Sequence, residues 1–174
     1  MTDPHAKTRP DRPSAPPPRV DGIPAELQAR AQWLVWVYSW DKNKWTKVPK
    51  TPHGRLASTT DPSTWSTFDE ALRGYQRASN RHFGRLDGIG FVTCDADPYV
   101  LIDLDHCVDG KTVRPWARPI IAMAKKEGAY IERSPSLSGV HIIGKGPQGA
   151  PGAKRHDAEL YCRDRFFTIT GMPL

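Results

Sequence analysis

The stretch "YVLIDLDHC", Tyr99–Cys107, decides the fold, because it has the composition of a strand buried in a sheet and yet contains two carboxylates. In a strand, residues i and i+2 project to the same face, so Asp103 and Asp105 point to one side while Ile102 and Leu104 point to the other. Burying an unpaired carboxylate is costly, so two on one face need a compensating cation. Hard divalent ions such as Mg²⁺ or Mn²⁺ prefer oxygen ligands, and the pattern therefore predicts a strand that holds metal.

The alternative is a solvated face on which the two acids pair with Lys or Arg side chains. A third carboxylate favours the metal. In "DAELYC", Asp157–Cys162, the side chain of Glu159 alternates with apolar neighbours and can face the same site. Three acids at this spacing suit a two-metal phosphoryl-transfer centre, in which the ions lie about 3.5–4 Å apart and stabilise the attacking and leaving oxygens.

A hydroxyl-rich turn precedes a histidine in "SPSLSGVHI", Ser134–Ile142. Ser136, Ser138 and His141 are suitable hydrogen-bond donors for phosphate oxygens. A histidine in a strand is more often structural than functional. His141 is a candidate phosphate-binding residue only because the acidic residues occur in the same sequence.

Composition bounds the class of protein. The chain has 174 residues, of which 38% are hydrophobic, enough for one compact domain with a sizeable core. It contains no apolar run of membrane-spanning length and no export signal, so we expect a cytoplasmic protein with no membrane partner. Three cysteines without a close-spaced pair indicate free thiols. The net charge of +6 favours polyanionic partners.

The first twenty residues differ from the rest. They hold six of the seventeen prolines and almost no large apolar side chains, so they cannot bury enough surface to fold alone. We therefore predict a disordered Pro/Arg-rich arm over residues 1–21 and a single folded domain over residues 22–174.

The hydrophobic pattern of that domain predicts an α+β fold with strands grouped around few helices. Helices are expected over Gly22–Ala31, over Ser66–Ala78 with a capping box at Thr67 and Glu70, and over Trp116–Glu127, where Pro119 distorts the first turns or marks the real start. Two strands joined by the turn "DKNK" and two adjacent antiparallel strands joined by "ADP" are expected before residue 106. Three further strands or strand pairs follow it, in "AYIER", "VHIIGKG" and "DAELYC" with "RFFTITG".

Six tryptophans could stack on exposed bases, as proteins that hold single strands often do. Most of them are expected in the core, and the sequence alone identifies no nucleic-acid-binding residue.

Taken in order, "IDLDH", "SPSLSGVHI" and "AELYC…RFFTITG", with "WTKVP", "STTDPSTW" and "DGIGFV" upstream, resemble the prim-pol domain of plasmid and phage replication proteins, of the archaeo-eukaryotic primase superfamily. The resemblance covers residues 33–174. Asp103 and Asp105 match its first acidic motif, Gly139–His141 its small-x-His motif, and Glu159 its third motif. It implies a bipartite α+β core whose RRM-like sheet carries the acids, with a cleft that takes template and nucleotide.

The resemblance also implies an activity, which is template-directed nucleotidyl transfer by a DNA primase or polymerase. Asp103, Asp105 and Glu159 would be catalytic and would position two Mg²⁺ or Mn²⁺ ions. His141 would bind the triphosphate, with positive charge from Lys47 and Arg165. The implied partners are a single-stranded DNA template with its primer, nucleoside triphosphates, and a helicase or other replication proteins.

Two departures from the family pattern keep other functions open. Gly139 stands where the family has serine, so a phosphate-binding hydroxyl must come from Ser136 or Ser138, and Leu137 stands where glycine is common. The alternatives are a non-catalytic module that binds single-stranded nucleic acid, a catalytically incomplete fragment of a replication protein, and a metal-dependent nuclease built on the same acids.

Overall fold

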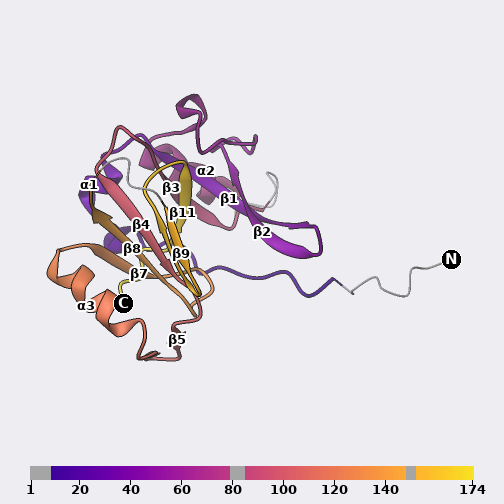
Figure 1. The fold of residues 1–174 in the computed structure, drawn as a ribbon. Helices are drawn as coiled ribbons and strands as arrows, with labels where there is room; N and C mark the ends of the chain where they lie inside the picture. The colour runs from indigo at the N-terminus through magenta and orange to yellow at the C-terminus, as the bar shows by residue number, and fades with distance from the viewer. Residues whose placement is uncertain (1–8, 79–84, 148–151) are drawn as a thin grey trace.

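A computed structural model describes residues 9–78, 85–147 and 152–174 (Figure 1). The fold is α+β, as the sequence predicts, and its strands pair antiparallel throughout. One sheet has four strands in the order β11-β3-β1-β2. Its strands are β1 (Trp33–Asp41), β2 (Lys44–Lys50), β3 (Gly88–Thr93) and β11 (Arg165–Ile169).

The second sheet has five strands in the order β7-β8-β4-β10-β9. Its strands are β4 (Tyr99–Leu104), β7 (Tyr130–Arg133), β8 (Val140–Lys145), β9 (Ala153–Arg155) and β10 (Ala158–Tyr161). A short hairpin follows β4 and is formed by β5 (Val108–Asp109) and β6 (Thr112–Val113). The sequence pattern did not indicate β5, β6 or β9, because each has only two or three residues and no apolar alternation.

Helices α2 and α3 begin where the sequence signals place them. α2 (Phe68–Ala78) starts with the predicted capping box, in which Thr67 N donates to Glu70 Oε2 at 2.9 Å and Glu70 N donates to Thr67 Oγ1 at 3.3 Å. Pro119 lies in the first turn of α3 (Arg118–Lys126) and so marks its start. None of the described helices is long and apolar enough to cross a membrane. The remaining short helices are α1 (Ala25–Gln28), which is shorter than predicted, η1 (Val20–Gly22) and η2 (Pro62–Thr64).

The prediction that the strands on either side of "ADP" pair with each other is wrong, because β3 belongs to the four-stranded sheet and β4 to the five-stranded one. The turn between them is a corner held by the buried Asp97. Its carboxylate accepts hydrogen bonds from Cys94 N at 2.8 Å, Tyr99 N at 2.8 Å and the Gln32 side chain at 2.6 Å. Three donors fix the chain as it leaves one sheet and enters the other.

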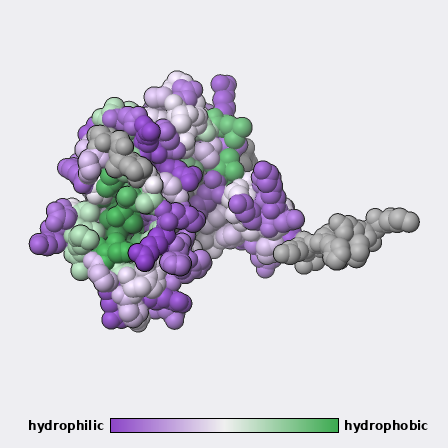
Figure 2. Space-filling view, viewed as in Figure 1, coloured by the Kyte–Doolittle hydropathy of each residue, from purple (hydrophilic) through white to green (hydrophobic). Residues whose placement is uncertain are grey.

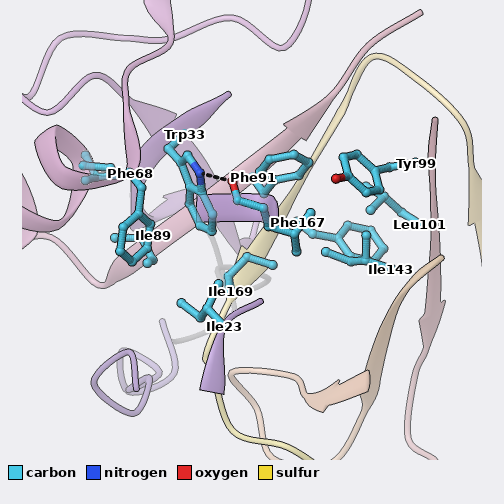
Figure 3. Close-up of a cluster of buried hydrophobic side chains, with 13 residues drawn as sticks. Ile23, Trp33, Phe68, Ile89, Phe91, Tyr99, Leu101, Ile143, Phe167 and Ile169 are labelled. Atoms are coloured by element: carbon cyan, nitrogen blue, oxygen red, sulfur yellow. Dashed lines mark hydrogen bonds between the residues drawn. The ribbon is translucent and has the colours of Figure 1, made fainter. Parts of the chain in front are cut away.

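Two hydrophobic clusters follow from the alternation of side chains along β4. Tyr99 and Leu101 join the larger cluster, which combines side chains of both sheets, including Trp33 and Phe167 (Figure 3). Leu104 joins the smaller cluster beneath α3, against which Ile102 also packs. Asp103 therefore lies on the face of β4 that is turned toward the four-stranded sheet.

The three cysteines are free thiols, as predicted. Cys107 and Cys162 are buried and Cys94 is partly exposed. Burial raises the pKa of Cys107 to about 11, which keeps this thiol protonated at neutral pH.

Residues 9–19 run as extended chain and contact the four-stranded sheet. The Arg12 guanidinium binds both carboxylate oxygens of the buried Asp87, at 2.8 and 2.6 Å, and Arg19 N donates to Thr170 O at 2.8 Å. The boundary between arm and domain at residues 21 and 22 stays a prediction.

Gly171 follows β11 and packs directly against the backbone of Arg19 in the N-terminal segment. We expect Gly171→Ala to lower the free energy of unfolding by about 2–5 kcal/mol. Its φ of +64° is unfavourable for a side chain, and an added Cβ would lie 1.9 Å from Arg19 O. Urea denaturation measures the loss. Gly110→Ala is the control, because Gly110 has a similar φ of +57° and no atom of the described residues lies within 4 Å of its Cβ position. Equal losses in the two variants would contradict the importance of the contact.

Candidate active site

A row of polar side chains crosses the five-stranded sheet from edge to edge. Glu132 on β7 lies opposite His141 on β8, and His141 lies opposite Asp103 on β4. Asp103 in turn lies opposite Glu159 on β10, which lies opposite Lys154 on β9. Directly opposite residues have Cβ atoms about 4.5–5.5 Å apart. The register thus brings together the predicted Asp103, Glu159 and His141.

Asp103 is the central member of this row, and 25% of its side chain is exposed. Its Oδ1 is buried and has no hydrogen-bond partner among the described residues. His141 Nε2 lies 3.8 Å away, too far for a hydrogen bond. Burial raises the pKa of Asp103 above its usual value, although His141 and Lys47 oppose this; Asp105 and Glu159 add to the increase. A desolvated carboxylate oxygen without a donor is suited to binding a cation.

Asp105 does not share the strand with Asp103, which corrects the expectation of one continuous acidic face. β4 ends at Leu104, and Asp105 is an exposed residue of the following turn, with its N–H donating to Asp157 O at 2.7 Å. Its charge still contributes to the raised pKa of Asp103, so the two carboxylates belong to one electrostatic site. Within the three described ranges, no group of three or more His, Cys, Asp or Glu side chains is already assembled as a metal-ligand set.

Glu159 faces the site but is engaged by two neighbours. The Lys154 ammonium pairs with one of its oxygens, and the Tyr161 hydroxyl donates to the other. Arg165 supports this arrangement, because it donates to the Tyr161 hydroxyl at 3.1 Å and its guanidinium lies 4.3 Å from the centroid of the Tyr161 ring. The structure thus shows for Glu159 a pairing with lysine of the kind that the sequence left open for Asp103 and Asp105.

Glu132 is a member of the site that the sequence did not reveal. Its side chain is fully buried and accepts hydrogen bonds from Thr170 N, Thr170 Oγ1 and Gly171 N at 2.8–3.1 Å, and from the Tyr130 hydroxyl at 2.6 Å. His141 Nδ1 lies 3.2 Å from its Oε1. Because a carboxylate accepts, the proton at Nδ1 is fixed there and Nε2 points toward Asp103.

The four-stranded sheet contributes the other wall of the site. A pocket of about 210 Å³ is lined by Lys47, Asp103, His141, Tyr161, Arg165, Phe166, Phe167 and Thr168. The two basic residues favoured from the sequence therefore lie beside Asp103 and His141, although they come from β2 and β11.

Lys47 is an exposed residue, and its Nζ lies 3.5 Å from Thr168 Oγ1. Protein atoms around the ammonium desolvate it and lower the pKa of Lys47, and the carboxylates of Asp103, Asp105 and Glu132 partly offset this. A cation held near these acids balances part of their charge.

The serine-rich turn lies outside the lining of that pocket. Its hydroxyls form a chain, with 3.0 Å between Ser134 Oγ and Ser136 Oγ and 2.9 Å between Ser136 Oγ and Ser138 Oγ. Gly139 has no room for a side chain, because a Cβ would lie 2.8 Å from Leu104 O and 2.9 Å from Ser134 Oγ. This explains the departure from the family's serine, and a phosphate-binding role for Ser136 or Ser138 stays a prediction.

No family model matches the chain. The chain is 39% identical over 160 residues to a DNA primase-polymerase of Nitratiruptor phage NrS-1, in an alignment that covers 86% of this chain. The same alignment covers 20% of the relative, so the chain spans a fifth of that protein's length. Over 86% of its length the chain is therefore a homologue of one part of a phage DNA primase-polymerase, which supports a prim-pol domain.

Proposed function

We propose that this chain is a catalytic domain for metal-dependent, template-directed nucleotidyl transfer, acting as a DNA primase or polymerase in plasmid or phage replication. The observation that carries the proposal is the buried Asp103 Oδ1, which has no hydrogen-bond partner in the described part of the chain. Asp103 is in register with Glu159 and His141 and shares one pocket with Lys47 and Arg165. The name of the phage relative supports the same activity.

The topology supports a finer proposal about the fold. β4 and β7 both run antiparallel to β8, which lies between them, so they are parallel to each other. α3 connects them, which makes a split β-α-β unit. We infer that the five-stranded sheet is the RRM-like sheet of a bipartite primase-type core and that the four-stranded sheet belongs to the second lobe.

Asp103, Asp105 and Glu159 would hold the metal ions. Their donor atoms are carboxylate oxygens, which suit Mg²⁺ or Mn²⁺, and none of the residues that the structure describes donates a hydrogen bond to the buried Asp103 Oδ1. Bound ions would neutralise charge on the reacting phosphate and lower the pKa of the attacking hydroxyl. Glu159 would have to exchange its contact with Lys154 for such an ion.

The remaining side chains of the site would bind the incoming nucleotide. Because Glu132 holds Nδ1, a protonated His141 presents its Nε2–H to the pocket, where it can donate to a phosphate oxygen. Lys47 and Arg165 add positive charge from the opposite wall. A polyanionic triphosphate is the ligand that these three groups fit best.

Primer extension tests the proposal. A labelled primer on a single-stranded template, with all nucleotides and Mg²⁺ or Mn²⁺, is expected to lengthen, and EDTA is expected to stop the extension. Tight template binding without extension in either metal would instead favour the non-catalytic module or the incomplete fragment. Degradation of the labelled DNA without incorporation would favour the nuclease.

A further inference from the structure

A strip of aromatic and cationic side chains lies along one face of the β1–β2 hairpin. It starts in the candidate active site and extends from there to the tip of the hairpin. Tyr38 pairs with Lys47 and Trp40 pairs with Trp45, so these four side chains project from the same face of the two strands. Lys47 begins the strip inside the site, where its ammonium lies 5.9 Å from the centroid of the Trp36 ring. The strip therefore continues the site toward the tip of the hairpin.

Two tryptophans end the strip at the tip. The Trp40 and Trp45 rings meet edge to face, with centroids 5.4 Å apart and planes 66° apart. Both are partly exposed, whereas Trp33 and Trp36 of the same sheet are buried. Core packing thus accounts for the first two tryptophans of β1 and does not account for the pair at the tip.

The Arg9 guanidinium shows that a planar group can occupy this ring face. It lies 4.3 Å from the centroid of the Trp45 ring and 6.0 Å from that of Trp40. Trp45 Nε1 donates to Pro10 O at 3.2 Å, so the segment that carries Arg9 is held against the same ring. A nucleobase is likewise a flat group that stacks on aromatic side chains.

The charge of the hairpin suits a polyanion. Residues 39–50 contain four lysines and one aspartate, which gives a formal net charge of +3. The hairpin projects beyond the body of the domain in Figure 1, and hydrophilic side chains surround that region in Figure 2. The lysines of this segment are Lys42, Lys44, Lys47 and Lys50.

We propose that this strip binds the single-stranded DNA template, with bases stacked on Trp45 and Trp40 and phosphates near the hairpin lysines, and leads the strand to the site at Lys47. The inference rests on the proposed function for the identity of the strand. Its own support is the combination of two partly exposed indole rings, positive charge and continuity with the pocket, and the strand would displace the Arg9 guanidinium from the Trp45 ring.

Fluorescence anisotropy of a labelled oligo-dT strand, in EDTA and at fixed salt, measures the contribution of the rings. The double variant Trp40→Ala/Trp45→Ala is expected to bind roughly 5- to 100-fold more weakly than wild type. Trp40→Phe/Trp45→Phe keeps two aromatic faces and is expected to retain most of the affinity. Trp116→Ala is the matched control, because Trp116 is 40% exposed, lines a different pocket, and is expected to change affinity less than twofold.

Three results would overturn the inference: no oligo-dT binding by wild type, affinity of the alanine pair within twofold of wild type, or equal losses in the phenylalanine and alanine pairs. Thermal melting of each variant checks that the domain remains folded. Because binding is measured without metal or nucleotide, it is independent of catalysis. An enzyme that extends primers but binds equally well without the two rings would leave the proposed function standing and remove this inference alone.

Discussion

Replacing Asp103 with asparagine is expected to reduce primer extension by roughly 10³-fold or more. Asparagine has nearly the same shape but no charge, so the variant lacks the anionic oxygen that we propose as a metal ligand. Asp103 is the strand carboxylate at the centre of the row, between His141 and Glu159. Single-nucleotide incorporation with Mg²⁺ or Mn²⁺, at saturating template, measures the loss.

The same variant is expected to keep its fold and its affinity for template. Burial raises the pKa of Asp103, so the ionised carboxylate is less favourable in the folded chain than in the unfolded one. This cost is present above the raised pKa and absent below the unfolded value, so in EDTA at neutral pH Asp103→Asn should melt no lower than wild type.

Asp109→Asn is the control for loss of charge alone, because Asp109 is an exposed acid on β5. It should change incorporation less than twofold. Full incorporation by Asp103→Asn would exclude Asp103 as a metal ligand and with it the proposed mechanism.

Replacing Glu132 with alanine is expected to lower the free energy of unfolding by about 3–5 kcal/mol. The change removes the acceptor for the hydrogen bonds of Thr170, Gly171 and Tyr130, and the buried N–H groups of Thr170 and Gly171 lose their carboxylate partner. It also releases His141 Nδ1. Urea denaturation followed by circular dichroism measures the change, and incorporation should fall with it because His141 is no longer oriented.

Glu132→Gln separates the stabilising role from the positioning role. The amide keeps the shape but offers one oxygen and two N–H donors, so the expected loss of stability is smaller, about 1–3 kcal/mol. If Glu132 positions His141, the apparent KM for nucleotide should rise in this folded variant while template affinity stays constant. Glu127→Ala, at an exposed acid after α3, is the control and should stay within about 0.5 kcal/mol of wild type. Similar losses in Glu132→Ala and Glu127→Ala would contradict the role assigned to Glu132.

The local structure and many residues of the site could be predicted from the amino-acid sequence. Alternation in "YVLIDLD" predicted a strand with Asp103 on the face opposite Leu104, and the two hydrophobic clusters confirm it. The capping box at Thr67 and Glu70 predicted the start of α2. These features depend on side chains close in the chain, which obey the periods of strand and helix whatever surrounds them.

Features that depend on which strands become neighbours were not accessible in the same way. The "ADP" turn resembles a hairpin connection, but the side chain of Gln32, far away in sequence, helps Asp97 to form a corner between two sheets. Asp105 leaves the strand because β4 ends one residue before it. Both outcomes follow from contacts between segments that are distant in the sequence, and local propensity contains no information on such contacts.

The sequence by itself determined the chemistry that is available, namely Asp103, Asp105, Glu159 and His141 in motifs of recognisable order. The tertiary structure decided which of these side chains come together in the site. Cross-strand register placed His141 between Glu132 and Asp103, paired Glu159 with Lys154, and brought Lys47 and Arg165 from the other sheet into the same pocket. The physical reason is that a buried charged group needs hydrogen-bond partners, and the fold, not the spacing in the sequence, supplies them. Glu132 is one acid in a short strand until the fold buries it and surrounds it with donors.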